Sequence, residues 1–216
     1  IKKNKREFYT HTGILRGERI TVMSSGIGTE NIDIVMNELD ALVNIDLKNK
    51  EFKSEHTSLE LFRLGTCGSV NPDVEVDQML VTQNVVGLDG LLRFYADYEF
   101  ENSFSRNFMA KFPYENIKGM LYFSDWAEDI SDYYQDAKYH GNTATFPGFY
   151  APQGRQLRLK ALDDRFLETL NDLGVSNFEM ETSAIYGLSK LLGHKALTVN
   201  NVIANRRRGE FASDHH

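Results

Sequence analysis

The amino-acid sequence predicts an α/β fold in one domain, with a mixed central β-sheet surrounded by helices. Two observations lead to this prediction. Short apolar runs of strand length alternate along the chain with amphipathic stretches of helical length, and neither an internal repeat nor a low-complexity linker interrupts them. The length of 216 residues also suits one domain of this class with a large core.

The first half of the chain begins with a predicted strand, turn and helix. Residues 19–25 (RITVMSS) have the composition of a strand, and a glycine turn follows at residues 26–28. Further strands are predicted at residues 59–64, 79–82 and 85–92. The helix after the turn has one apolar stripe at helical spacing, formed by Ile32, Val35, Met36, Leu39, Leu42 and Val43.

The second half continues the alternation. Helices are predicted at residues 126–136 and 161–173, with a strand at residues 138–146 between them. Residues 177–188 (NFEMETSAIYGL) have the pattern of a short strand that gives way to a helix, and residues 195–204 (KALTVNNVIA) that of a last buried strand. Ligands in such folds gather at the carboxyl ends of strands, so the polar and glycine-rich segments there are the first candidates for a site.

The composition limits the partners and the compartment. A formal net charge of −7 makes the chain a poor candidate for non-specific nucleic-acid binding. Cys67 is the one cysteine, so an internal disulfide is impossible and we expect a reducing, cytoplasmic setting. The sequence has no run of 18 apolar residues, so we expect no membrane-spanning helix.

A glycine turn between a strand and a helix, as in SGIGTEN at residues 25–31, is also found in dinucleotide sites. The match fails at two positions. Asn31 stands where the pattern G-x-G-x-x-G needs its last glycine, and the next strand ends in Arg63 where an NAD site needs an acid for the ribose. We therefore reject a dinucleotide site, and a tight turn that leads into a helix remains.

The segment FRLGTCGS at residues 62–69 combines an arginine with two glycines and small polar side chains. Glycines let backbone N–H groups turn toward a ligand, Thr66 and Ser69 add hydroxyls, and Arg63 adds a forked cation. This chemistry suits an oxyanion such as phosphate. An arginine that merely pairs with a carboxylate is an equally weighted alternative for this segment alone.

The segment FYAPQGR at residues 149–155 has aromatic residues before an amide and an arginine. Gln153 offers a donor and an acceptor side by side, and Arg155 offers donors only. Such a pair can recognise a flat heterocycle with carbonyl oxygens and a ring N–H, with Phe149 packed on it. An ordinary loop is the alternative, and the segment alone favours it.

Two glutamates, Glu179 and Glu181, lie where the short strand at residue 177 gives way to a helix. Acids in a first helical turn are favoured by the helix dipole, so capping is the simpler interpretation. The alternative is that a carboxylate here holds a ligand with hydroxyl groups.

Together these segments resemble the nucleoside phosphorylases of the uridine phosphorylase type. The resemblance runs from Arg6 to about Arg206, and the order and spacing of its motifs are those of the family. The motifs are REF at residues 6–8, SSGIG at 24–28, RLGTCGS at 63–69, FYAPQGR at 149–155, NFEME at 177–181 and VIANR at 202–206.

The resemblance implies an α/β nucleoside phosphorylase fold, a hexamer built from dimers, and sites at the dimer interface. It implies phosphate binding by Arg63, Thr66 and, across the interface, Arg6. For the base it implies Gln153, Arg155 and Phe149, with Arg206 in support. For the ribose it implies Glu181, taking the hydroxyls, together with Met180 and Thr66.

Some parts expected of the family are absent or changed. The first strand with its Gly-Asp-Pro-x-Arg phosphate loop, an N-terminal histidine that contacts ribose, and the end of the C-terminal helix are missing from residues 1–216, and we expect a truncated sequence. Some relatives bind a monovalent cation through Glu, Ile and Ser. The matching residues are Glu7, Ile27 and Asn31, and the change from Ser to Asn leaves that cation open.

The reaction that the resemblance implies is reversible phosphorolysis of uridine to uracil and ribose 1-phosphate, a pentosyl transfer in pyrimidine salvage. It needs inorganic phosphate as co-substrate, no other cofactor and no resident metal. Alternatives are a purine nucleoside phosphorylase, a nucleosidase that uses water, and a non-catalytic nucleoside-binding protein. Purine enzymes of this fold tend to carry an aspartate after the last strand, where this chain has residues 201–205 (NVIAN).

Overall fold

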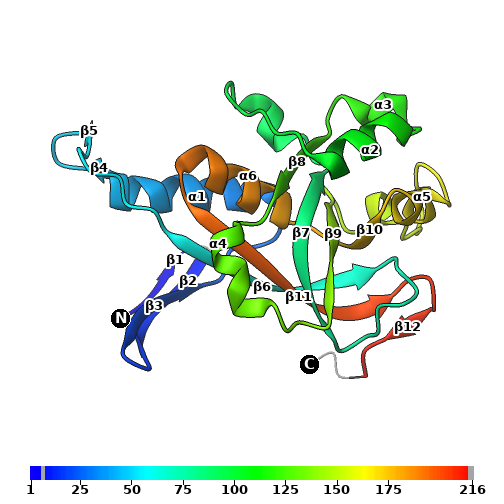
Figure 1. Ribbon diagram of the computed structural model, residues 1–216, viewed down its shortest axis with the longest axis horizontal. Helices are drawn as coiled ribbons and strands as arrows, with labels where there is room; N and C mark the ends of the chain where they lie inside the picture. The colour runs from blue at the N-terminus through cyan, green and yellow to red at the C-terminus, as the bar shows by residue number, and fades with distance from the viewer. Residues whose placement is uncertain (6–7, 214–216) are drawn as a thin grey trace.

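The structure, a computed structural model, describes residues 1–5 and 8–213 (Figure 1). The candidate site residues Arg6 and Glu7 therefore lie outside the described residues. The central sheet has seven strands in the order β12-β11-β6-β10-β9-β7-β8. Their bounds are β6 Glu60–Ser69, β7 Met79–Gly87, β8 Tyr122–Asp125, β9 Tyr139–Thr145, β10 Val175–Glu179, β11 Lys195–Asn205 and β12 Glu210–Phe211.

The central sheet is mixed, as predicted, and it curls back on itself. β6 runs parallel to β11, and β9 runs parallel to both β7 and β10, whereas β10 is antiparallel to β6. β11 also pairs with β7, so β11, β6, β10, β9 and β7 close a five-stranded ring. Residues that point into this ring come from distant parts of the chain and are brought close together.

Helices surround the sheet and bury its two largest apolar clusters. α1 (Thr29–Asn44) lies beside α6 (Thr182–Leu192), with Ile32 and Ile185 in the cluster between them (Figure 1). A second cluster is rich in phenylalanine and packs under α2 and α5. The remaining helices are α2 Ser103–Lys111, α3 Glu115–Lys118, α4 Glu128–Ser131, α5 Phe166–Asp172, η1 Leu91–Phe94, η2 Asp132–Tyr134 and η3 Ala151–Gln153.

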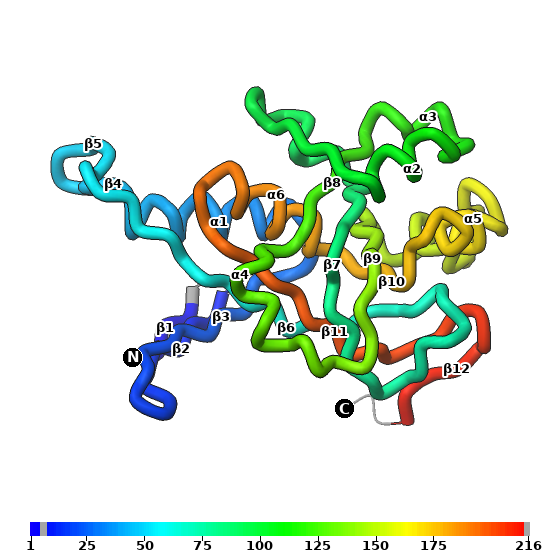
Figure 2. Tube along the Cα trace, viewed as in Figure 1, coloured from blue at the N-terminus to red at the C-terminus, as the bar shows by residue number. Residues whose placement is uncertain are grey.

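The N-terminal strands form a sheet of their own. β1 (Lys2–Lys5), β2 (Phe8–Leu15) and β3 (Glu18–Met23) pair antiparallel and extend away from the body of the molecule, as the blue segment in Figure 2 shows. A small hairpin, β4 (Ile45–Asp46) with β5 (Glu51–Phe52), extends at the end of α1. The strand predicted at residues 19–25 is therefore present, but it belongs to this separate sheet.

Three predicted boundaries were wrong in informative ways. The strand predicted at residues 59–64 continues to Ser69, so the segment RLGTCGS lies within β6 and is not a loop after it. The strands predicted at residues 79–82 and 85–92 are one strand, β7. The helix predicted at residues 161–173 starts only at Phe166, because Leu162 is exposed and does not join the apolar face.

Among the described residues, none of the helices has the length and apolar character needed to cross a membrane.

Candidate active site

The site begins where β10 ends and α6 starts. Glu179, the last residue of β10, accepts hydrogen bonds from the backbone N–H groups of Glu181 and Thr182 at 2.8 and 2.9 Å. Its other oxygen accepts the hydroxyl of Thr145, the last residue of β9, at 2.6 Å. Glu179 is thus a buried carboxylate that caps α6 and joins it to β9, which agrees with the capping role predicted for it.

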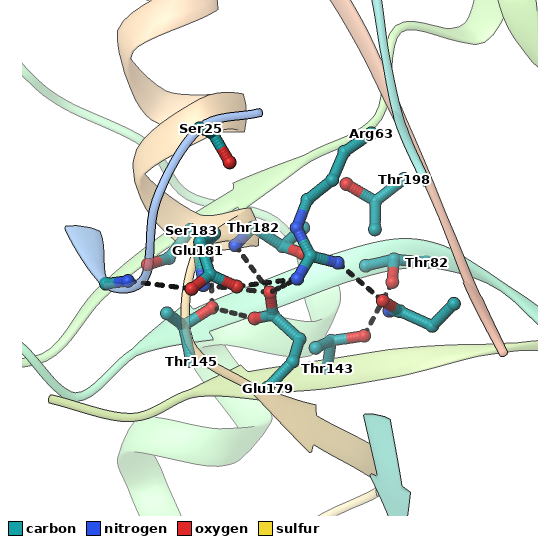
Figure 3. Close-up of polar contacts among 12 residues, drawn as sticks. Ser25, Arg63, Thr82, Thr143, Thr145, Glu179, Glu181, Thr182, Ser183 and Thr198 are labelled. Carbon is teal, nitrogen blue, oxygen red and sulfur yellow. Dashed lines mark hydrogen bonds and ion pairs between the residues drawn. The ribbon is translucent and has the colours of Figure 1, made fainter. Parts of the chain in front are cut away.

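Glu181 has a different set of partners. Its Oε2 accepts a hydrogen bond from Nη2 of Arg63 at 2.6 Å, and its Oε1 accepts the backbone N–H of Gly28 at 2.7 Å (Figure 3). Gly28 has a φ of 91°, a conformation that favours glycine, and it directly precedes α1. The glycine turn that resembled a dinucleotide site therefore directs its N–H at a protein carboxylate.

Arg63 projects from the middle of β6 into the five-stranded ring. Nη2 lies 3.3 Å from Glu179 Oε2 in addition to its bond with Glu181, and Nη1 donates to Oδ1 of Asn200 at 2.6 Å. Gly65 makes room for this side chain, because a Cβ at that position would lie 2.3 Å from Nη1. Gly65 therefore admits the guanidinium, a role that the sequence did not suggest.

Polar side chains from the other four strands of the ring meet around Arg63 (Figure 3). Those with almost no exposed surface are Thr82, Thr143, Thr145, Asn177, Glu179, Thr198 and Asn200. Hydrogen bonds connect several of them, for example Thr82 to Thr143 at 2.7 Å and Thr143 to Asn177 at 2.8 Å. Of these residues, Asn200 and Glu179 contact the guanidinium of Arg63 directly.

The charges of this cluster do not balance. Burial disfavours the charged form of Arg63, but the charges of Glu179 and Glu181 outweigh it and raise the pKa of Arg63. Burial and the charge of Glu179 raise the pKa of Glu181, and Arg63 opposes both effects. One guanidinium thus faces two carboxylates, so the described residues alone give the cluster an excess of negative charge.

The segment predicted to contact a base forms a compact structure after β9. Gln153 ends the short helix η3 and is buried, and Gly154 follows with a φ of 70°. Arg155 donates through Nη1 to the backbone carbonyl of Phe149 at 2.7 Å and to Oε1 of Gln153. Its guanidinium carbon lies 3.8 Å from the centre of the Phe149 ring, so the structure brings these three residues together.

Arg206 lies near this group, directly after β11. Burial lowers the pKa of Arg155, and the neighbouring charge of Arg206 lowers it further. Two neighbouring cations favour an electron-rich partner. Arg206 also donates its backbone N–H to the carbonyl of Ser69 at 2.9 Å, which ties the ends of β11 and β6 together.

The remaining candidate site residues are Thr66 and Met180. Side chains alternate along a regular strand, so Thr66 leaves β6 on the face opposite Arg63 and Gly65, and it is exposed. The structure therefore does not bring Thr66 to Arg63, and its assignment to phosphate and ribose stays a prediction. Met180 lies between the two glutamates and is partly buried.

Two residues of the site were missed by sequence reasoning. Thr145 ends a predicted strand, the position at which ligand-binding residues are expected. Asn200 is an amide within an apolar strand, and a polar residue that is forced into a core needs a partner there. These were the signals that could have identified them.

At both candidate cation positions, some of the possible ligand atoms already take part in hydrogen bonds among the described residues. Asn31 donates its amide to the carbonyl of Ile27 at 2.8 Å, which is the one oxygen that an isoleucine can offer. Elsewhere, Asp40, His56 and His194 lie close enough to share a metal. His194 Nδ1 accepts the N–H of Leu59 at 3.2 Å, so its proton lies on Nε2, which faces Asp40 at 3.3 Å.

The architecture agrees with the nucleoside phosphorylase fold that the sequence motifs imply. The chain belongs to the phosphorylase superfamily, whose sequence model matches residues 1–215.

Curated relatives and a solved structure agree with this assignment. The chain is 28% identical over 210 residues to a uridine phosphorylase of Thermococcus kodakarensis, covering 95% of this chain and 65% of that protein. It is 26% identical over 205 residues to a DeoD-type purine nucleoside phosphorylase of Colwellia psychrerythraea, covering 95% of this chain and 72% of that protein. The structure of a Trypanosoma brucei nucleoside phosphorylase, described as showing uridine phosphorylase activity, superposes with a TM-score of 0.81 at 26% identity, covering all of this chain and 80% of that one.

Proposed function

We propose that this protein is a uridine phosphorylase that converts uridine and phosphate reversibly into uracil and ribose 1-phosphate in pyrimidine salvage. The observation that carries the proposal is the group formed by Gln153, Arg155 and Phe149, together with the separate cluster of Arg63, Glu179 and Glu181. An amide and a guanidinium can recognise the carbonyl and ring N–H edge of uracil, while the phenyl ring packs on its face. Arg206 adds a second cation near that edge.

In the proposed reaction the C1′–N1 bond of uridine breaks and its electron pair leaves with the uracil. Positive charge develops on the ribose, and a phosphate oxygen forms the new bond to C1′. Arg155 and Gln153 stabilise the departing uracil anion, and preorganised donors of this kind are commonly the largest catalytic contribution. Glu181 accepts the ribose hydroxyls and aligns C1′ with the phosphate.

Phosphate is proposed to bind at Arg63. One arginine beside two carboxylates is a poor site for a dianion, so further positive charge is required. We propose that Arg6 of the partner subunit supplies it, as the family resemblance implies. The chain spans 65% and 73% of the length of two uridine phosphorylases that it resembles.

A dimer, assembled further into a hexamer, is therefore part of the proposal. Ile14 and Val22 of the N-terminal sheet are 78% and 64% exposed, and Leu64, next to Arg63 on the outer face of β6, is 74% exposed. A second copy of the chain would cover these apolar side chains and complete the phosphate site. Light scattering of the full-length protein tests this, and a monomer at assay concentration would contradict it.

Asn205 favours uridine over a purine nucleoside. A purine enzyme benefits from an acid beside the base. Asn205 carries an amide instead, and both its nitrogen and its oxygen already make hydrogen bonds. Its Nδ2 donates to the carbonyls of Asn71 and Val74, and its Oδ1 accepts the N–H groups of Arg207 and Arg208. It has no proton to give to a departing purine.

The proposal is tested with a panel of uridine, deoxyuridine, thymidine, inosine and adenosine, each supplied with phosphate. We expect the largest kcat/KM for uridine, with ribose 1-phosphate as the product. Preferred turnover of inosine or adenosine would contradict the assignment. The single buried cysteine accords with a reducing compartment, so we propose a cytoplasmic location.

A further inference from the structure

We propose that Asn200 is a positioning residue for phosphate, which acts by holding the Arg63 guanidinium in place through a neutral acceptor. Asn200 lies on β11 directly beside Gly65 of β6 and has no exposed surface. Its Oδ1 accepts Nη1 of Arg63 at 2.6 Å, while Glu181 accepts Nη2 at the same distance. The inference rests on the proposed function, because it assigns a role within the same phosphate site.

Two different acceptors fix the plane of the guanidinium. Nη1 and Nη2 are held from β11 and from the start of α6, and Gly65 leaves the space in which the group lies. With both ends held, Arg63 cannot rotate about its last bonds. Glu181 alone would hold one end only, and it is also the group proposed to turn to the ribose.

The neutrality of Asn200 matters because Arg63 already faces Glu179 and Glu181. A third carboxylate at position 200 would hold Arg63 equally well but would add another negative charge where phosphate is proposed to bind. An amide oxygen gives the hydrogen bond without the charge. This explains why an amide, and not an acid, stands at this point of the ring.

The amide nitrogen of Asn200 indicates that position 200 requires an oxygen acceptor for Arg63. Among the described residues, Nδ2 of Asn200 has no hydrogen-bond partner and is fully buried. Leaving a buried donor unpaired is costly, so packing alone would favour an apolar residue in this strand.

The test compares Asn200→Ala and Asn200→Asp with a matched control, Asn177→Ala. Asn177 is equally buried in the same ring, also accepts one hydrogen bond and also has an unpartnered Nδ2, but its hydrogen bond comes from Thr143 and not from Arg63. The full-length variants are assayed for uridine phosphorolysis while phosphate and uridine are varied separately, and unfolding is followed by urea titration.

Asn200→Ala should raise KM for phosphate about tenfold or more, the range expected for losing one hydrogen bond to a charged group, with KM for uridine changed less than about twofold. Asn200→Asp should raise KM for phosphate further. Asn177→Ala should lose comparable stability but keep the parent's KM for phosphate. If Asn200→Ala fails to fold, Asn200→Asp, which keeps the volume, decides alone.

An unchanged KM for phosphate in both Asn200 variants, or an equal rise in Asn177→Ala, would overturn the inference. If the parent shows no phosphate-dependent turnover, the proposed function fails separately, and phosphate binding measured by calorimetry decides the role of Asn200. Weaker phosphate binding in the Asn200 variants than in Asn177→Ala supports it. Equal binding, or no phosphate binding by the parent, rejects it.

Discussion

Nη2 of Arg63 lies 2.6 Å from Oε2 of Glu181, so the arginine proposed for phosphate and the carboxylate proposed for ribose are bonded to each other. Phosphate must therefore compete with Glu181 for Arg63, and the ribose must compete with Arg63 for Glu181. This pair connects the two halves of the site, and it makes the binding of the two substrates interdependent.

Phosphate should accordingly strengthen nucleoside binding. An oxyanion that attracts Arg63 loosens its bond to Glu181, and Glu181 is then free to accept ribose hydroxyls. Calorimetry of uridine binding with and without sulfate, as an unreactive oxyanion, should show at least about fivefold tighter binding with sulfate, and the coupling must be reciprocal. Independent binding of the two ligands would show that the pair does not couple them.

The two neighbouring glutamates should separate stability from activity. Glu179→Ala removes a buried carboxylate that accepts two backbone N–H groups and a hydroxyl, so it should lower the free energy of unfolding by about 2 kcal/mol or more. Glu181→Ala should lower kcat/KM for uridine much more than it lowers stability. Urea unfolding and steady-state kinetics of both variants check this. Normal turnover by Glu181→Ala would mean that Glu181 serves only the start of α6 and not the ribose.

His194 should make stability fall in mild acid. Burial, with a contribution from His56, lowers its pKa below the ordinary value of 6.5 despite the opposing charge of Asp40. A histidine with a lowered pKa in the folded protein contributes stability above about pH 6.5, and that contribution is lost as the pH falls below it. Urea unfolding between about pH 7.5 and 5 should therefore show a decline that His194→Asn reduces and the control His56→Asn reduces less. An identical decline in all three proteins would exclude His194 as its source.

The protein should not depend on potassium. The carbonyl of Ile27 accepts the amide of Asn31, so a cation there would have to share this oxygen with an internal hydrogen bond. Turnover and melting temperature should be the same in potassium, sodium and choline chloride at equal ionic strength. Asn31→Ser frees the carbonyl and should introduce a response to potassium. A parent enzyme that is activated by potassium would show that the amide does not block the site.

The sequence predicted the architecture well because hydrophobic periodicity and short motifs can be recognised within single segments of the chain. It placed the helices corresponding to α1 and α6, and the family resemblance assigned the ribose to Glu181 and not to Glu179. It could not predict that β6 continues through Gly65 and Gly68, because glycines usually indicate a turn. Here a Cβ at either position would meet Arg63 or Phe178. The contact between Arg63 and Asn200 was equally hidden, since 137 residues separate the two and only the pairing of β6 with β11 brings them together.

The most direct test of phosphorolysis follows uridine cleavage by phosphorus NMR, with and without phosphate, in the parent and in Arg63→Ala. The parent should form one ribose 1-phosphate for each uracil released and should be inactive without phosphate. Arg63→Ala should lose about a hundredfold or more in kcat/KM for phosphate. Uracil release that continues undiminished in phosphate-free buffer, or Arg63→Ala with the parent's activity, would contradict the proposed phosphorylase.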